Sequence, residues 1–211
     1  MAEYHLYCFA QSGNAYKAAL MLETTGCDWG SRFVDFFNGE TRSPEYRRIN
    51  VMGEVPVLVH GDTTLSQSGV ILDYLAEKTG KHGWNNDTER REILRWLMFD
   101  NHKLTGYTAT YRFMRAFMKD ANPAVVEFLG GRVRAAYSVL AAHLADRDWV
   151  VGNRATIADI SLCGYLFFDD EIGVNFEESY PAIHRWLERI KALPGWKHPY
   201  ELMPGHPLPG S

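Results

Sequence analysis

The pattern of strand and helix signals changes near residue 80, and this change limits the folds open to the chain. Short runs of bulky residues mark strands at 4–8, 32–36, 56–59 and 63–65. Helical signals lie between them, which makes the order β-α-β-α-β-β-α. After the loop at 81–86 no strand signal follows. We therefore expect a small α/β domain over residues 1–80 and an all-helical domain over residues 87–211.

The second part carries the signals of successive helices. A long helix begins at Asp87 and meets no breaker other than Gly106 before Asn122 and Pro123. The segment 156–159, Thr-Ile-Ala-Asp, resembles a capping box that opens an apolar helix. A last helix begins at Pro181, and its inner stripe is expected to consist of Ile183, Trp186, Leu187 and Ile190.

Composition and charge exclude several classes of function. The 211 residues include 22 Lys and Arg against 26 Asp and Glu, a net charge of −4, so the chain has no general electrostatic attraction to nucleic acid or to an anionic membrane. No apolar stretch approaches the roughly 20 residues that span a bilayer, and the first residues do not resemble a signal peptide. The eight His show no metal-ligand spacing. The three Cys are odd in number and widely spaced, which favours a reducing, cytoplasmic compartment.

Polar residues stand where two helices of the first part begin. Ser12 and Asn14 follow the first strand, and Gln67 and Ser68 open the last helix of the α/β part. Ser and Asn are ordinary N-caps. A helix N-terminus also presents free N–H groups and a partial positive charge, which favour a bound anion. From the residues alone, ordinary helix capping is the preferred interpretation.

Four short motifs in order carry a family resemblance: residues 12–17, 50–56, 65–68 and 156–159. With this order and length, the chain resembles the cytosolic glutathione transferases, most of all bacterial members related to the theta and nu groups. The resemblance implies a thioredoxin-like N-terminal domain followed by an all-α domain. It also implies glutathione as cosubstrate, a homodimer, and a function in detoxification.

The resemblance assigns the chemistry to Ser12, with Asn14 as a second polar contact. The Ser12 hydroxyl would donate a hydrogen bond to the glutathione sulfur at the helix N-terminus. A helix end contributes about 0.3–2 kcal/mol, and one pKa unit is about 1.36 kcal/mol. The dipole alone therefore lowers a thiol pKa by at most roughly 1.5 units, and a hydrogen bond to the charged sulfur adds about 1.5–3 kcal/mol. Together they bring the thiol pKa below neutral pH.

The remaining glutathione contacts are carried over residue by residue. The Val55-Pro56 bond is expected to be cis, which turns the Val55 backbone toward the cysteinyl backbone of glutathione. Gln67 and Ser68 would bind the γ-glutamyl group, although Gln67 is neutral where many relatives have an acid. Glu54 either contacts the peptide or is simply solvated.

Four further residues are candidates with an equally ordinary alternative. Arg42 would meet the glycine carboxylate, or is a solvated surface residue. Asp100 would reach the glutathione of the partner chain and offset the missing charge at Gln67, or lies on an exposed helix face. Tyr107 and Tyr111 would line the electrophile pocket, although such a stripe is more often core.

The sequence thus predicts an enzyme, a dimeric glutathione transferase acting on an electrophile. One alternative is a glutathione-dependent disulfide reductase or peroxidase, which the spacing of Ser12, Asn14 and Lys17 favours by its similarity to the nu-like group. Another is a non-catalytic interaction module on the same fold. The sequence does not identify the electrophile or disulfide.

Overall fold

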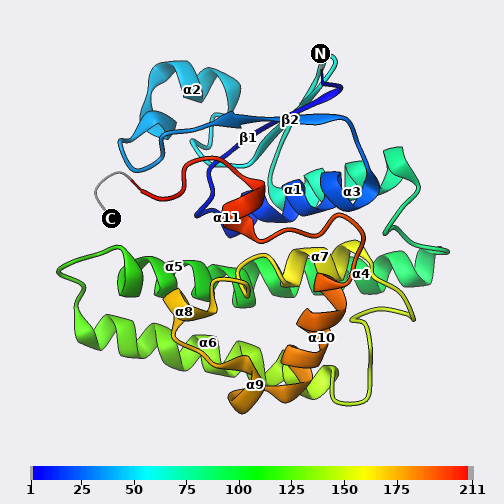
Figure 1. Ribbon diagram of the computed structural model, residues 1–211, viewed down its shortest axis with the longest axis vertical. Helices are drawn as coiled ribbons and strands as arrows, with labels where there is room; N and C mark the ends of the chain where they lie inside the picture. Colours follow the sequence, from blue (N-terminus) through cyan, green and yellow to red (C-terminus); the bar gives the residue numbers. More distant parts are fainter. Residues whose placement is uncertain (1, 209–211) are drawn as a thin grey trace. The chain divides into compact units, whose positions relative to one another are not determined.

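A computed structural model describes residues 2–208 and divides the chain into two compact units (Figure 1). The second unit comprises residues 82–192, and the first comprises residues 1–81 together with the C-terminal segment from residue 193. The sequence placed that segment in the helical part. Its described residues instead bond to the first unit, where Ala10 N donates to Pro204 O at 2.7 Å.

The first unit is built on a four-stranded sheet of order β2-β1-β3-β4 in the described part of the chain. The strands are β1 (Tyr4–Cys8), β2 (Trp29–Phe33), β3 (Val57–His60) and β4 (Thr63–Ser66). β1 pairs with β2 in parallel, whereas β3 is antiparallel to both of its neighbours. The predicted second strand, 32–36, is shifted by three residues, because the chain turns back at Phe36, whose N–H donates to Val34 O at 2.9 Å.

Helices cover both faces of this sheet. Figure 1 shows α1 (Gly13–Thr25) and α3 (Ser68–Thr79) side by side on one face and α2 (Pro44–Ile49) on the other. Residues 40–42 form the short helix η1, and α11 (Pro199–Leu202) lies against α1. Gly26 ends α1 at a φ of 73°, a conformation that glycine adopts without steric cost. The predicted thioredoxin-like α/β domain is confirmed.

The described residues of the second unit form helices and the loops between them, without a strand. Its main helices are α4 (Asp87–Phe99), α5 (Thr105–Ala116), α6 (Pro123–His143), α7 (Ile157–Leu162) and α10 (Pro181–Lys191). Two short helices, α8 (Asp169–Ile172) and α9 (Phe176–Ser179), were not predicted. A π-helical turn, η2 (Asp100–Leu104), joins α4 to α5, so the predicted long helix is present but wider at its centre. The predicted inner stripe of α10 is fully or almost fully buried.

The predicted capping box holds the second unit together. The buried Asp159 carboxylate accepts hydrogen bonds from Thr156 N at 2.8 Å, Val150 N at 2.9 Å and Trp186 Nε1 at 2.9 Å. These bonds connect α7, the loop before it and α10. Burial raises the pKa of Asp159, although the hydrogen bonds oppose the shift. None of the helices in the described residues has the length and apolar character needed to cross a membrane.

Candidate functional site

Ser12 caps helix α1 directly after the first strand. Its Oγ accepts a hydrogen bond from Ala15 N at 3.1 Å, and its carbonyl accepts one from Tyr16 N at 2.9 Å. The residue is 5% exposed. A hydroxyl group that accepts an N–H bond retains its own O–H as a donor. Ser12 therefore combines a helix N-terminus with a donor that can bond to an anion.

Asn14 is oriented by two donors. Its Oδ1 accepts from Lys17 Nζ at 2.9 Å and from Ser68 Oγ at 3.4 Å. Because the amide oxygen accepts from both donors, the amide nitrogen of Asn14 points away from Lys17 and Ser68 and can donate to a ligand. The contact between Asn14 and Ser68 brings the N-termini of α1 and α3 together.

Lys17 is a member of this cluster that the sequence did not single out as a site residue. Its side chain is 1% exposed, which is rare for lysine. The spacing of three residues between Asn14 and Lys17 places both side chains on one face of α1 and was the available signal. The ammonium group adds a positive charge next to the two helix N-termini.

Gln67 has an unusual backbone at the start of α3. Its φ of 69° and ψ of 114° lie in a region that residues other than glycine rarely adopt, and such conformations cost about 1–3 kcal/mol and cluster at binding sites. The side-chain amide donates to Glu54 Oε2 at 3.0 Å and to Met52 Sδ at 3.1 Å. The structure therefore places the Glu54 carboxylate directly beside Gln67.

The Val55-Pro56 peptide bond is cis, as predicted. The backbone carbonyl of Glu54, the residue before Val55, accepts hydrogen bonds from Tyr46 Oη at 3.0 Å and Asn50 Nδ2 at 2.8 Å. Among the described residues, the backbone N–H and C=O of Val55 have no hydrogen-bond partner. This half-buried residue thus presents a donor and an acceptor of the kind that an extended peptide can pair with.

Arg42 ends the short helix η1 and is exposed. The neighbouring Thr41 is buried, and its carbonyl would lie 2.9 Å from a Cβ atom built at Gly53. The segment that carries Arg42 therefore contacts the segment that leads to Glu54. A bond between Arg42 and a carboxylate stays a prediction.

Asp100 does not lie on an exposed helix face, which was one of the two alternatives that the sequence left open. The side chain is 1% exposed, and its carboxylate accepts hydrogen bonds from Thr105 Oγ1 and Ser161 Oγ. The π-helical turn directs it into the core of the second unit, toward α7. The prediction that Asp100 reaches a partner chain is corrected: the carboxylate is used within its own unit.

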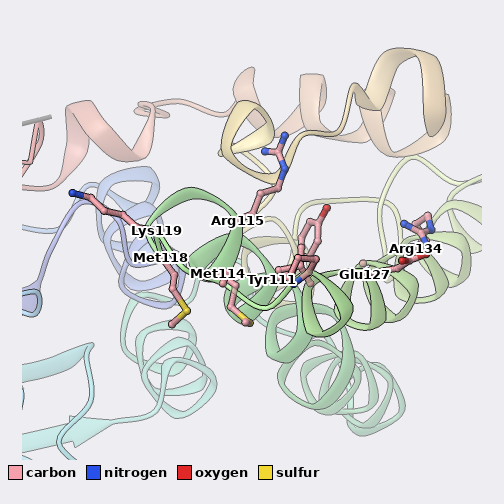
Figure 2. Close-up of a pocket in the computed structure, with 11 residues that line it drawn as sticks. Tyr111, Met114, Arg115, Met118, Lys119, Glu127 and Arg134 are labelled. Atoms are coloured by element: carbon pink, nitrogen blue, oxygen red, sulfur yellow. The ribbon is translucent and has the colours of Figure 1, made fainter.

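Tyr107 and Tyr111 are half-buried on α5. The Tyr107 ring lies 5.7 Å from Lys103 Nζ. Tyr111 lines a cavity between α5 and α6 (Figure 2). The second unit therefore presents at least one of these rings to a cavity, whereas contact with an electrophile stays a prediction.

The cysteine in the first strand, Cys8, is poorly suited to act as a nucleophile. Cys8 is fully buried, and burial raises the pKa of its thiol to about 12. Cys163 is buried as well, and Cys27 is half-buried. Within residues 2–208 there is no group of three or more His, Cys, Asp or Glu that could hold a metal ion.

The family follows from two matches that together cover most of the chain. The model of the glutathione S-transferase N-terminal domain matches residues 2–77, and that of the glutathione S-transferase C-terminal domain matches residues 107–194. The chain belongs to the glutathione S-transferase family.

Similar proteins include enzymes and a regulator. A possible glutathione S-transferase from Rhodopseudomonas palustris is 31% identical, with a TM-score of 0.87 over 93% of this chain and 89% of that chain. Ure2p in complex with glutathione is 26% identical, with a TM-score of 0.84 over 92% of this chain and 96% of that chain. The transcriptional regulator URE2 of Saccharomyces cerevisiae is 26% identical over 90% of this chain and 66% of that protein.

Proposed function

We propose that the protein is a glutathione transferase that binds glutathione on its first unit and activates the thiol at Ser12. The observation that carries the proposal is the hydrogen bond of Ser68 Oγ to Asn14 Oδ1 at 3.4 Å, because it joins two helix N-termini beside the Ser12 hydroxyl. Glutathione carries an anionic sulfur and an anionic glutamyl carboxylate, and each requires such a positive end.

The residues of the first unit fit the chemical groups of glutathione. The Val55 backbone pairs with the cysteinyl backbone, and Ser68 at the start of α3 binds the γ-glutamyl carboxylate. Glu54, held beside Gln67 at 3.0 Å, supplies the negative charge for the glutamyl ammonium that Gln67 lacks. Arg42 forms an ion pair with the glycine carboxylate.

In the reaction, the thiol proton leaves to solvent and Ser12 donates a hydrogen bond to the sulfur anion. The amide nitrogen of Asn14, held by Lys17, is the second donor. The sulfur then forms a bond to an electrophilic carbon, and the leaving group departs with its electron pair. The protein contributes positioning and a lowered thiol pKa. Tyr107 and Tyr111 of the second unit are the proposed contacts to the electrophile.

A disulfide substrate is the alternative reaction at the same site. The spacing of Ser12, Asn14 and Lys17 favours it, and so does the Lys17 charge, which would stabilise a thiolate leaving group. A third possibility is a regulatory module that binds glutathione without turnover, which the similarity to the transcriptional regulator URE2 supports. We further propose a cytoplasmic homodimer, as in the family, with a function in detoxification.

One set of measurements tests these proposals. The protein is applied to immobilised glutathione, and thiolate absorbance is recorded after glutathione is added in solution. Turnover is then screened with a halo-aromatic compound, a hydroperoxide and a small disulfide. Binding, thiolate formation and turnover of the halo-aromatic compound are expected. Binding without turnover of any of the three would favour the regulatory module, and failure to bind would refute the proposal.

A further inference from the structure

A buried tyrosine of α2 contacts the loop that carries Glu54 and Val55. Tyr46 is 2% exposed, and its Oη donates a hydrogen bond to the backbone carbonyl of Glu54 at 3.0 Å. Asn50, at the end of α2, donates to the same carbonyl through Nδ2 at 2.8 Å. A carbonyl oxygen has two lone pairs, so the first unit itself occupies both acceptor positions of the Glu54 carbonyl.

The Tyr46 ring is held in the core between α2 and the sheet (Figure 1). It forms a buried cluster with Val34 and Val57, against which Tyr7 and Val55 pack. The Tyr7 ring meets it edge to face, with 6.4 Å between the ring centroids. Because side chains in a close-packed core interdigitate and sit in rotamer minima, the phenolic oxygen has a fixed position beside the Glu54 carbonyl.

The Tyr46 phenol remains a donor at neutral pH. Burial raises the pKa of Tyr46, and the charge of Glu40 raises it further. A phenol keeps its proton at a pH below its pKa, so Oη carries the hydrogen that bonds to Glu54 under all conditions in which glutathione binding would be measured.

The orientation of the Glu54 carbonyl determines where a neighbouring N–H points. Within residues 2–208 the cis peptide bonds lie before Pro56 and Pro207, so the bond between Glu54 and Val55 is trans. In a planar trans peptide the C=O and the N–H point in opposite directions. Because the carbonyl of Glu54 points toward Tyr46 and Asn50, the N–H of Val55 points away from both.

This N–H is available to a ligand. It has no acceptor in the part of the chain that the structure describes, and Val55 is half-buried. An extended peptide beside Val55 pairs with it through a backbone carbonyl. The two donors behind the peptide plane therefore set the direction of a group that the proposed glutathione site uses.

We propose that Tyr46 is a positioning residue for the bound peptide: its phenol directs the Val55 N–H toward the cysteinyl carbonyl of glutathione. The phenol does not touch the ligand and acts only through the peptide group between Glu54 and Val55. The inference rests on the proposed glutathione site. It adds a requirement to that site, since only ligands with a carbonyl group at this position benefit from the tyrosine.

The first test compares Tyr46→Phe with Tyr7→Phe in the 211-residue chain. Tyr46→Phe keeps the ring in the core and removes only the donor to Glu54. Tyr7→Phe removes a phenol of the same cluster that has no hydrogen-bond partner within residues 2–208. Tyr46→Phe should weaken calorimetric binding of glutathione at least threefold, as loss of one neutral hydrogen bond predicts, and should leave the pKa of the bound thiol unchanged. Tyr7→Phe should bind glutathione as the wild type does.

A pair of ligands separates positioning from a general loss of structure. S-Methylglutathione carries the cysteinyl carbonyl, whereas S-methyl-γ-glutamylcysteamine keeps the γ-glutamyl group and the sulfur but lacks that carbonyl. Tyr46→Phe should weaken binding of S-methylglutathione at least threefold and leave binding of the cysteamine analogue unchanged. Equal losses for the two ligands, or no loss for S-methylglutathione, would overturn the inference. Failure of the wild type to bind glutathione would refute the proposed function, and this inference with it.

Discussion

Replacing Ser12 by alanine separates two functions of one hydroxyl group. Its Oγ caps α1 by accepting from Ala15 N at 3.1 Å, and in the proposed reaction its O–H donates to the glutathione sulfur. Loss of such a cap costs about 0.5–2 kcal/mol of folding stability. Loss of a hydrogen bond to a charged atom costs about 1.5–3 kcal/mol. At about 1.36 kcal/mol for each pKa unit, the second loss raises the thiol pKa by about 1–2 units.

The assay follows the thiolate absorbance of bound glutathione against pH, together with the pH dependence of kcat/KM. In Ser12→Ala both midpoints should move to higher pH by the same amount. Ser12→Thr retains the hydroxyl group and should keep a profile close to that of the wild type. A Ser12→Ala profile that superimposes on that of the wild type would refute Ser12 as the activating donor.

A second cap with the same geometry is the control for stability. Ser43 caps α2, and its Oγ accepts from Tyr46 N at 3.1 Å. Ser43→Ala should lower the free energy of unfolding by a similar amount, about 0.5–2 kcal/mol, without any change in the thiol pKa. A pKa shift in Ser43→Ala equal to that in Ser12→Ala would mean that the shift reflects general destabilisation.

Three further predictions follow from contacts in the two units. Lys17→Met should raise the pKa of the bound glutathione thiol by about 1 unit, since Asn14 then loses the charged donor that orients its amide. A pH profile of thiolate absorbance identical to that of the wild type would contradict this prediction. Glu54→Gln should weaken glutathione binding about tenfold, because the glutamyl ammonium loses its carboxylate; calorimetry measures the change, and unchanged affinity would show that another group supplies the charge. Glu89→Gln should destabilise the second unit by about 1 kcal/mol at pH 7. The hydrogen bond from Arg154 holds the pKa of Glu89 below its usual 4.5. The difference in unfolding free energy between Glu89→Gln and the wild type should therefore be present above pH 4.5 and disappear as the pH falls through the lowered pKa. Denaturant unfolding at several pH values measures this difference, and a difference that persists in acid would exclude the ion pair as its cause.

Local signals explain most of what the sequence predicted correctly. The start of α1 at Ser12 and the capping box at Thr156 both depend on residues within one turn of each other. Such features are visible in the sequence because capping is a short-range interaction. The cis bond before Pro56 was predicted from the family resemblance, since a proline alone is usually trans.

The errors concern contacts between residues that are distant in the chain. The sequence left two alternatives for Asp100, a contact with the partner chain or an exposed helix face, but Ser161 and Thr105 donate to its carboxylate in the core of the second unit. The pairing of Glu54 with Gln67 and the contact of Asn14 with Ser68 were equally inaccessible, because both depend on the packing of the first unit. Burial of a polar residue can be predicted only when its partner is known.

The return of residues 193–208 to the first unit affects how the protein is made. The bond from Ala10 N to Pro204 O closes a segment that contains the whole second unit. During synthesis, the thioredoxin-like unit emerges first from the ribosome but cannot form its last contacts until the helical unit has been translated. A fragment that ends near residue 80 would lack the contact between Ala10 and Pro204, close to Ser12 in the chain. The first unit therefore cannot be produced complete by ending the chain at the loop between the two units.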